Sequence, residues 1–286
     1  MYNSCMNHLI SITKSDGTKQ LFEEEKLINS LKRVGASPQI IEDVVDEVEK
    51  EMLEGMATNE IYRKAFALLH RHSLPTAVKY SVRRALMELG PDGFPFERFV
   101  ARIFKTWGYE SVTDQNLLGG CVEHEVDVVA WKGDELAMAE AKFHNEFGIK
   151  SDLKVALYVK SRYDDLAENA FSYGGKEWKL TERWLITNTK FTDRAIKYGT
   201  CKDLKMLGWN YPIKESLHDI IEQNGLHPIT CMTTISRDQK RELISRNCLV
   251  CIDVVGNPNI LNEIGIKDTD KEKVLTEAQI IIEQAK

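Results

Sequence analysis

Hydrophobic and polar positions change their spacing several times along this chain, and each change predicts a different element. Apolar residues recur at i, i+3, i+4 and i+7 from Phe96 to Trp107, which predicts an amphipathic helix over residues 95–107. Two short apolar stretches follow, at 125–129 and 136–142, joined by a polar turn. This spacing predicts two adjacent strands with polar residues at positions that a strand would bury.

The chain before residue 90 has a different pattern, with a short hairpin followed by helical spacing. The hairpin pairs residues 10–13 with 19–22 around a turn at 15–17. Helix start signals at Ser37-Pro38 and Thr58 support two of the helices. The four helices expected here cover about residues 24–34, 38–53, 58–72 and 75–89.

After the paired strands, apolar stretches and helical spacing alternate again. The elements expected outside that pair are a strand near 109–113, a helix at about 151–171, a buried strand at 184–187, a helix at 191–207, a short strand and turn at 208–212, and helices at 235–246 and 271–285. This order predicts an α/β (α+β) chain with an N-terminal helical block, a mixed sheet flanked by helices, and a small helical C-terminal tail.

Domain boundaries follow from breaker residues and length. The segment 90–95, Gly-Pro-Asp-Gly-Phe-Pro, separates two helical patterns. A length of 286 residues suits two domains with a smaller third unit. We therefore expect domains at 1–90 and 91–226 and a helical region at 227–286.

Composition places the chain among soluble globular proteins, with 43% hydrophobic and 29% charged residues. Its apolar runs are shorter than a membrane span, and no secretory signal pattern opens it, so we expect a cytoplasmic protein without a membrane partner. Six scattered cysteines argue against a disulfide framework. The single C-x-x-C at 248–251 offers too few ligands for a structural zinc and predicts buried thiols.

The formal net charge of −6 argues against indiscriminate coating of DNA. Local patches decide binding, however, and the charges are unevenly distributed. Acidic residues concentrate between 42 and 51, whereas basic residues gather later, at Lys150, Lys154, Lys160 and Arg162. The overall charge therefore does not exclude a polyanionic substrate.

The polar residues in the paired strands are Asp127, Glu140 and Lys142. Because side chains alternate between the faces of a strand, Glu140 and Lys142 point the same way. We expect them to lie within a few ångströms of Asp127 on the adjacent strand. Uncompensated charges on an apolar sheet cost roughly several kcal/mol, which a divalent metal ion would offset. The alternative is an edge hairpin that carries a surface Lys–Glu pair.

An Asp, twelve intervening residues and then Glu-x-Lys resembles the PD-(D/E)xK nuclease signature. The flanking residues 119–120, 122–125 and 143–145 resemble the Mrr-like restriction endonuclease branch, although Val126 replaces a common Pro and Glu140 a common Gln. The resemblance implies a Mg²⁺-dependent DNA endonuclease of restriction or defence type. It implies Asp127, Glu140 and Lys142 as catalytic residues, with the metal held by Asp127, Glu140 and the carbonyl of Ala141.

The resemblance also gives a role to Glu97, because Mrr-like enzymes often carry an acid at this position of their first core helix. The alternative is an ordinary polar residue on a solvated helix face. His124 and His144 bracket the signature and could contact phosphate. Gln115, Lys150 and Lys154 are further candidates for substrate contact, with solvent exposure as the alternative for each.

Residues 8–88 resemble an ATP-cone, a nucleotide-sensing module. The matching residues are Thr13-Lys14-x-Asp16-Gly17, Phe22, Lys26 in a helix opening, Thr58-x-x-Ile61, and Tyr80 followed by Arg83-Arg84. The resemblance implies that ATP or dATP binds through Thr13, Lys14, Gly17, Phe22 and Lys26. Ser15 replaces a cation common in this family. Independently, Lys14 beside a glycine turn and Lys26 in a first helical turn could face one anion, or both could be solvated surface charges.

Together these patterns favour a DNA endonuclease regulated by nucleotide, expected to form a homo-oligomer. One alternative is a nucleotide-responsive DNA-binding regulator, but such ATP-cone repressors carry four zinc-binding cysteines before the cone, and only Cys5 precedes it here. Another is an inactive nuclease fold used as an oligomeric interaction module. Residues 257–266 resemble a helix-hairpin-helix turn, which contacts DNA phosphates, or form a simple helical cap.

Overall fold

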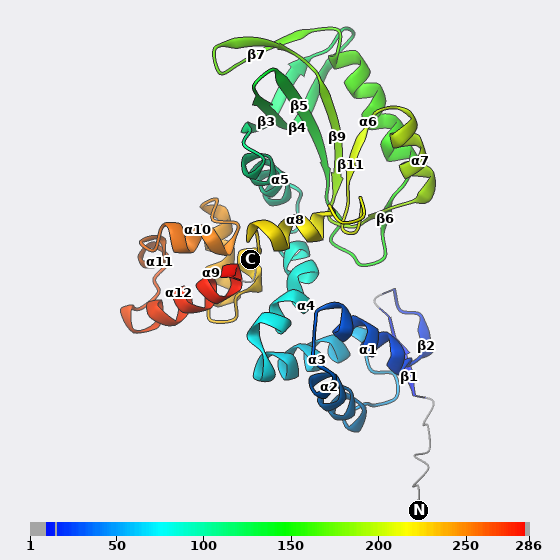
Figure 1. Cartoon of the computed structure of the whole chain (residues 1–286), viewed down its shortest axis with the longest axis vertical. Helices are drawn as coiled ribbons and strands as arrows, with labels where there is room; N and C mark the ends of the chain where they lie inside the picture. Colours follow the sequence, from blue (N-terminus) through cyan, green and yellow to red (C-terminus); the bar gives the residue numbers. More distant parts are fainter. Residues whose placement is uncertain (1–9, 15, 284–286) are drawn as a thin grey trace, which may run out of the picture. The chain divides into compact units, whose positions relative to one another are not determined.

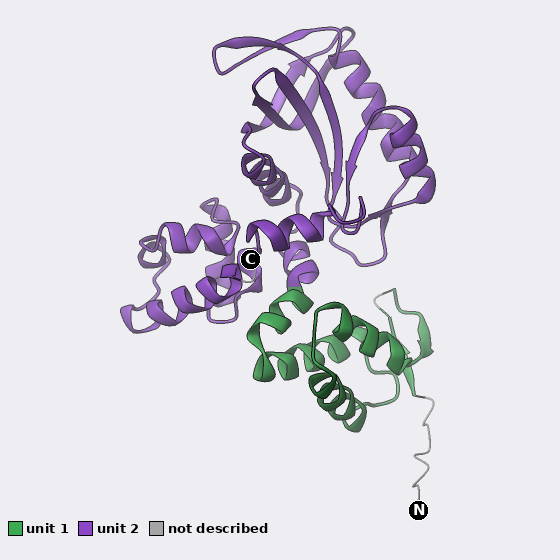
Figure 2. Cartoon of the chain, in the orientation of Figure 1, with its two compact units in different colours: residues 1–81 green, residues 82–286 purple. Residues whose placement is uncertain are grey.

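The computed structural model describes residues 10–14 and 16–283, which form two compact units, 1–81 and 82–286 (Figure 2). Cys5 and Ser15 lie outside the described residues. The predicted fold class is confirmed: a helical N-terminal part, a central mixed sheet with helices, and a helical C-terminal part. None of the described helices combines the length and apolar composition that a membrane span requires.

The first unit contains the predicted hairpin and helices. They are β1 Ser11–Thr13, β2 Lys19–Leu21, α1 Glu24–Arg33, α2 Pro38–Lys50, α3 Thr58–His72 and α4 Leu74–Met87, within which the unit boundary falls. The two strands pair antiparallel, and Ser37 caps α2 by accepting a hydrogen bond from the Ile40 amide. Leu31, Val44 and Leu69 are fully buried in the core between the helices.

The second unit is built on a five-stranded sheet of order β11-β9-β5-β4-β3 (Figure 1). Its strands are β3 Glu110–Leu118, β4 Glu123–Lys132, β5 Glu135–Lys142, β9 Glu182–Thr187 and β11 Lys205–Leu207. β3, β4 and β5 form an antiparallel meander, and β9 and β11 continue the sheet in parallel with β5. The two-residue strands β6 Lys150–Ser151 and β10 Lys190–Phe191 pair separately.

Three helices cover this sheet. Helix α5, Phe94–Thr106, packs against β3, β4 and β5, while α6 Leu153–Leu166 and α7 Asp193–Cys201 pack on each other and against β9 and β11 (Figure 1). The predicted apolar stripe of α5 is buried, with Phe96, Phe99 and Phe104 fully inaccessible. Since α5 and the β4–β5 pair were both expected from local spacing, the elements around the candidate chemistry follow from the sequence.

The helix predicted at 151–171 was too long, because it ends at Leu166. Residues 170–179 form the hairpin of β7 Ala170–Tyr173 and β8 Lys176–Lys179 instead. Gly174 and Gly175 turn this hairpin with φ of +57° and +76°, a conformation that glycine adopts without strain. The strand predicted near 109–113 was too short, because β3 pairs with β4 as far as Leu118.

The helix predicted at 191–207 was also too long. It ends at Cys201, and Asp203 takes a left-handed φ of +52°, which redirects the chain into β11. Met206 and Leu207 are buried there, and β11 rather than residues 208–212 is the closing strand. Pairing with β9 therefore overrides local helical spacing.

The C-terminal region is helical as predicted, with more elements than expected. They are α8 Leu217–Asn224, the 3₁₀ turn η1 Ile229–Cys231, α9 Arg237–Ser245, α10 Cys251–Gly256, α11 Ile260–Glu263 and α12 Asp268–Glu283. The buried carboxylate of Glu277 accepts hydrogen bonds from the amides and hydroxyls of Thr233 and Thr234. Cys248 and Cys251 are buried, as predicted. The helix-hairpin-helix resemblance of 257–266 stays a prediction.

Candidate active site

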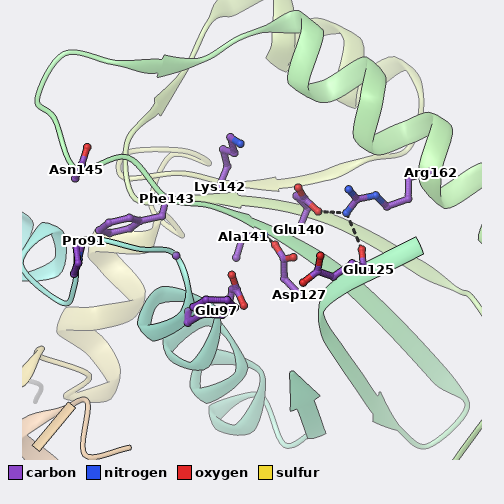
Figure 3. A pocket seen from close by; sticks show the side chains of 12 residues that line it. Pro91, Glu97, Glu125, Asp127, Glu140, Ala141, Lys142, Phe143, Asn145 and Arg162 are labelled. Atoms are coloured by element: carbon purple, nitrogen blue, oxygen red, sulfur yellow. Dashed lines mark hydrogen bonds and ion pairs between the residues drawn. The ribbon is translucent and has the colours of Figure 1, made fainter. Parts of the chain in front are cut away.

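A pocket of about 430 Å³ opens in the second unit between α5, the β4–β5 pair and α6 (Figure 3). Four acidic and two basic residues line it: Glu97, Glu125, Asp127, Glu140, Lys142 and Arg162. The structure thus brings Asp127, Glu140, Lys142 and Glu97, the four residues predicted to be catalytic, around one space. Glu125 and Arg162 join them without having been predicted as site residues.

The register of β4 and β5 places the two central carboxylates. Val128 pairs with Ala139, so Asp127 and Glu140 follow at neighbouring positions of adjacent antiparallel strands. The amide of Ala141 donates a 2.7 Å hydrogen bond to Oδ2 of Asp127, which fixes that carboxylate against β5. Glu97 faces the same space from the first turn of α5 (Figure 3).

Arg162 on α6 is the main residue that sequence reasoning missed. Its Nη1 donates to Oε2 of Glu140 and, at 2.9 Å, to the carbonyl of Glu125, as Figure 3 shows. Its Nη2 donates to the Tyr158 hydroxyl at 2.7 Å, and the guanidinium lies 4.8 Å from the centroid of that ring. Spacing of i, i+4 between Tyr158 and Arg162 was the available signal for a preorganised cation.

The pocket contains more acidic than basic side chains, and burial together with this imbalance shifts the pKa values of its carboxyl groups. Burial raises the pKa of Glu97 to about 8, with further upward contributions from the Asp127 charge and from Asp114. Burial and then the Glu140 charge raise the pKa of Asp127, while the Ala141 amide lowers it. Burial also raises the pKa of Glu140, against the opposing charges of Arg162 and Lys142. An added cation would relieve this repulsion.

The donor set suits a hard cation with few protein ligands. In the part of the chain that the structure describes, no group of three or more His, Cys, Asp or Glu side chains is arranged to hold a metal ion. Mg²⁺ requires less, because it keeps several waters and takes one or two carboxylates together with substrate oxygens. Asp127, Glu140 and the Ala141 carbonyl at the pocket wall fit that requirement.

A buried polar network fastens the end of β5 to β9. The Thr187 hydroxyl donates to the carbonyl of Lys142 at 2.8 Å, and Asn188 exchanges hydrogen bonds with the backbone of His144. The His144 ring lies 3.1 Å from the Ser151 hydroxyl, and burial lowers its pKa. His144 therefore helps to hold the strand that carries Lys142. Thr187, Asn188 and Ser151 are buried positioning residues that the sequence did not single out.

His124 has a similar structural partner. Its Nε2 lies 2.7 Å from Oδ2 of Asp165 on α6, and Asp165 also accepts from the Cys121 amide at 2.8 Å. The hydrogen bond with His124 is the largest of several that lower the pKa of Asp165 to about 2. His124, Gln115, Lys150 and Lys154 are not among the residues that line the pocket.

The predicted nucleotide-binding residues lie around the hairpin turn and the start of α1. The Thr13 hydroxyl donates to the Gly55 carbonyl at 3.0 Å, Lys14 is exposed, and Gly17 has a φ of +81°. Phe22 packs against the core of the first unit. Lys26 forms a 2.8 Å ion pair with Glu23, in which both side chains are more than half exposed. An exposed pair of this kind contributes little to stability.

Comparison with known proteins matches two parts of the chain to family models. Residues 10–87 match the ATP cone domain, and residues 227–282 match the model described as AF1548-like, C-terminal. The predicted ATP-cone is thereby confirmed. None of these matches names a nuclease, so the Mrr-like resemblance stays a prediction.

Two relatives match the chain over a longer stretch. An uncharacterized protein of Archaeoglobus fulgidus is 36% identical over 184 residues, which is 64% of this chain and 99% of the relative. The crystal structure of a protein of unknown function, AF1548, is similar with a TM-score of 0.55 and 35% identity, covering 67% of this chain and 99% of that one.

Proposed function

This chain belongs to the family of its uncharacterized Archaeoglobus fulgidus relative, and we propose that it is a Mg²⁺-dependent DNA endonuclease of the PD-(D/E)xK type. One observation carries the proposal. Asp127 and Glu140 stand on adjacent strands and, with Lys142, line a single pocket in which four acidic side chains are compensated by only two basic ones. That arrangement is what a hydrolase needs in order to bring a metal ion, a water molecule and a phosphodiester together.

Each polar residue of the pocket has a role in this proposal. Asp127, Glu140 and the Ala141 carbonyl would hold the metal ion, which would supply positive charge to offset that of the phosphate. Lys142 orients or deprotonates the attacking water and offsets the charge that develops on the phosphate oxygens. Glu97, facing the pocket from α5, contributes a hydrogen-bonding carboxyl to the same space.

Arg162 supports the same chemistry by positioning. It contacts Oε2 of Glu140, which restrains the rotamer of the side chain that would hold the metal ion. Its second anchor, the Tyr158 hydroxyl, keeps the guanidinium in place when the negative charge in the pocket changes. A preorganised carboxylate costs less ordering free energy when the metal ion binds.

Regulation by ATP or dATP is the second part of the proposal, and the confirmed ATP-cone supports it. In this proposal residues 1–90 bind the nucleotide, residues 91–226 cut DNA, and residues 227–286 assist that region. Lys14 and the start of α1 provide the cation and the helix N-terminus that a triphosphate uses, and the left-handed Gly17 turns the chain beside them. The proposal includes a homo-oligomer in which two copies of the chain each cut one strand.

A plasmid cleavage assay tests the proposal. Purified protein is incubated with supercoiled plasmid and Mg²⁺, with and without ATP or dATP, and compared with Glu140→Ala. We expect nicked or linear products from the wild type, a loss of cleavage with EDTA or in the variant, and a rate that changes with nucleotide. Intact plasmid under all wild-type conditions, or equal cleavage by Glu140→Ala, contradicts the nuclease assignment.

A further inference from the structure

A second cavity of about 810 Å³ lies in the same unit, and its lining is basic. It is enclosed by the segment 88–95, by α5 and by α9 of the C-terminal region. The cations on its wall are Arg98 from α5 and Arg237, Lys240 and Arg241 from α9, against the acidic Glu88 and Asp92. Four positive and two negative side chains leave a local charge of about +2 in a chain whose net charge is −6.

The basic cavity adjoins the acidic pocket. Pro91 and Phe94 line both, so the two spaces share a wall within one unit. The acidic pocket has the opposite balance, with four carboxylates against Lys142 and Arg162. A polyanion that brings one phosphate to the acidic pocket is repelled there and needs compensating positive charge close by.

Two basic residues of the cavity, Lys240 and Arg98, are only partly exposed. Lys240 donates to the Thr230 carbonyl at 3.1 Å, and burial lowers its pKa. The Nε of Arg98 is buried and has no hydrogen-bond partner among the described residues. Arg237 and Arg241 are exposed at the rim on the first and second turns of α9. The cavity thus has partly exposed cations inside and exposed cations at its opening, where Arg241 also forms an exposed ion pair with Asp238.

We propose that this basic cavity binds backbone phosphates of the DNA strand whose scissile phosphate enters the acidic pocket. The inference rests on the proposed function, which supplies the reason for DNA rather than another polyanion. A DNA strand carries a phosphate about every 3.4 Å of helix axis, so a strand held in one space presents further phosphates to the other. Phe94, 55% exposed on the shared wall, offers a face on which an unpaired base stacks.

Binding measured without cleavage tests the inference. Fluorescence anisotropy of a labelled 25-base-pair duplex is recorded in EDTA over a series of salt concentrations. The variant Arg237→Glu/Arg241→Glu reverses two exposed rim cations. We expect its dissociation constant to rise about tenfold or more near 0.1 M salt, and its salt slope to fall by about two. The milder Arg237→Gln/Arg241→Gln replaces it if charge reversal impairs folding.

A matched control separates local charge from net charge. Arg194→Glu/Lys197→Glu on α7 makes the same change in net charge on exposed residues of a different element. We expect the control to bind DNA within about twofold of the wild type. Equal weakening in both double variants, or wild-type binding by the α9 variant, overturns the inference.

Two further measurements separate the sources of phosphate and the two proposals. If the α9 variant loses affinity for ATP or inorganic phosphate and keeps wild-type affinity for the duplex, the cavity serves a free ligand and the inference is wrong. If the wild type cleaves DNA, and the α9 variant binds and cleaves DNA as well as the wild type does, the nuclease proposal holds and the phosphate site is wrong. If the α9 variant binds DNA more weakly but the wild type cleaves under no condition, the phosphate site holds and the nuclease proposal is wrong.

Discussion

At the scale of single residues, several charged side chains of the second unit lie where burial raises the free energy of the ionised form. Glu140 and Arg162 are 13% and 11% exposed and compensate each other, whereas Asp127 depends on a single backbone amide. Buried charges that lack full compensation are uncommon without a functional reason. The expected effects of changing these residues therefore differ between activity and stability.

Asp127→Asn should remove Mg²⁺-dependent cleavage while leaving the fold intact. The amide oxygen still accepts from Ala141, but the negative charge that holds the cation is gone, so we expect cleavage to fall by about a hundredfold or more. Plasmid cleavage rates measure this, with circular dichroism melting as the folding check. Asp134→Asn, in the exposed turn of the same hairpin, is the control and should cut normally. Wild-type cleavage by Asp127→Asn would place the chemistry elsewhere.

Arg162→Met should destabilise the fold, because it leaves Glu140 buried without its partner. We expect a loss of about 3–5 kcal/mol in the free energy of unfolding, measured with urea. The double variant Arg162→Met/Glu140→Gln removes both charges and should recover a large part of that loss. Additive losses in the two single variants would show that the ion pair does not couple them.

At the scale of elements, the loop between β3 and β4 is clamped to α6. Asp165 on α6 accepts hydrogen bonds from the amides of Cys121 and Val122 and contacts His124. The Gly120 amide donates to the Asp165 carbonyl at 2.9 Å. Because α6 also carries Arg162, these contacts connect the start of β4 to the helix that positions Glu140. Glycines in this loop allow the close approach.

The clamp should depend on acid pH with a defined sign. The pKa of Asp165 is lowered to about 2 from an ordinary 3.8, so its ionised form stabilises the folded state above pH 4. That contribution is lost as the pH falls from about 4 to about 2. Urea unfolding of the wild type and Asp165→Asn at several pH values should show a stability difference that shrinks across this window. A difference that stays constant would mean that Asp165 does not carry it.

Gly119→Ala should destabilise the second unit. A Cβ there would lie 2.1 Å from Oδ2 of Asp165, a side chain already fixed by hydrogen bonds, and 3.0 Å from the Val122 carbonyl. We expect a cost of about 1–3 kcal/mol in urea unfolding. Gly256→Ala is the matched control, since a Cβ at that position meets nothing within 4 Å. Equal effects of the two substitutions would contradict the close approach.

At the scale of the whole molecule, the chain joins an ATP-cone to a sheet-based unit that ends in an AF1548-like region. The acidic pocket and the basic cavity both belong to the second unit. In the proposed function, the positive charge of the basic cavity offsets the net charge of −6 where a polyanion would bind.

Nucleotide dependence should disappear in Lys14→Ala. Lys14 is an exposed cation beside the left-handed Gly17, and its removal takes away charge that a triphosphate needs. We expect ATP or dATP to change the wild-type cleavage rate and to leave the rate of Lys14→Ala unchanged, with ATP affinity measured by calorimetry. Lys19→Ala, an exposed lysine on β2, is the control and should respond like the wild type. A wild-type rate that is equal with and without nucleotide removes the regulatory proposal.

Local spacing was sufficient to predict the elements that carry the chemistry. The 3.6-residue period of α5 follows from which side chains can share one helix face, and the short apolar stretches of β4 and β5 mark strands that are largely buried. The helices predicted at 151–171 and 191–207 failed at their C-terminal ends. There, pairing in β7–β8 and in β11–β9 competes with helical propensity, and such partners are absent from any local window.

By itself the sequence determined the ATP-cone, helix α5, and the pair of strands on which Asp127, Glu140 and Lys142 stand. Only the tertiary structure decided what surrounds those residues. Arg162 reaches Glu140 from 22 residues away, and Thr187 reaches the Lys142 carbonyl from 45 residues away. Periodicity reports which face of an element a residue occupies, but the partner that it meets there depends on how distant elements pack. The charge balance of the pocket is therefore a property of the fold.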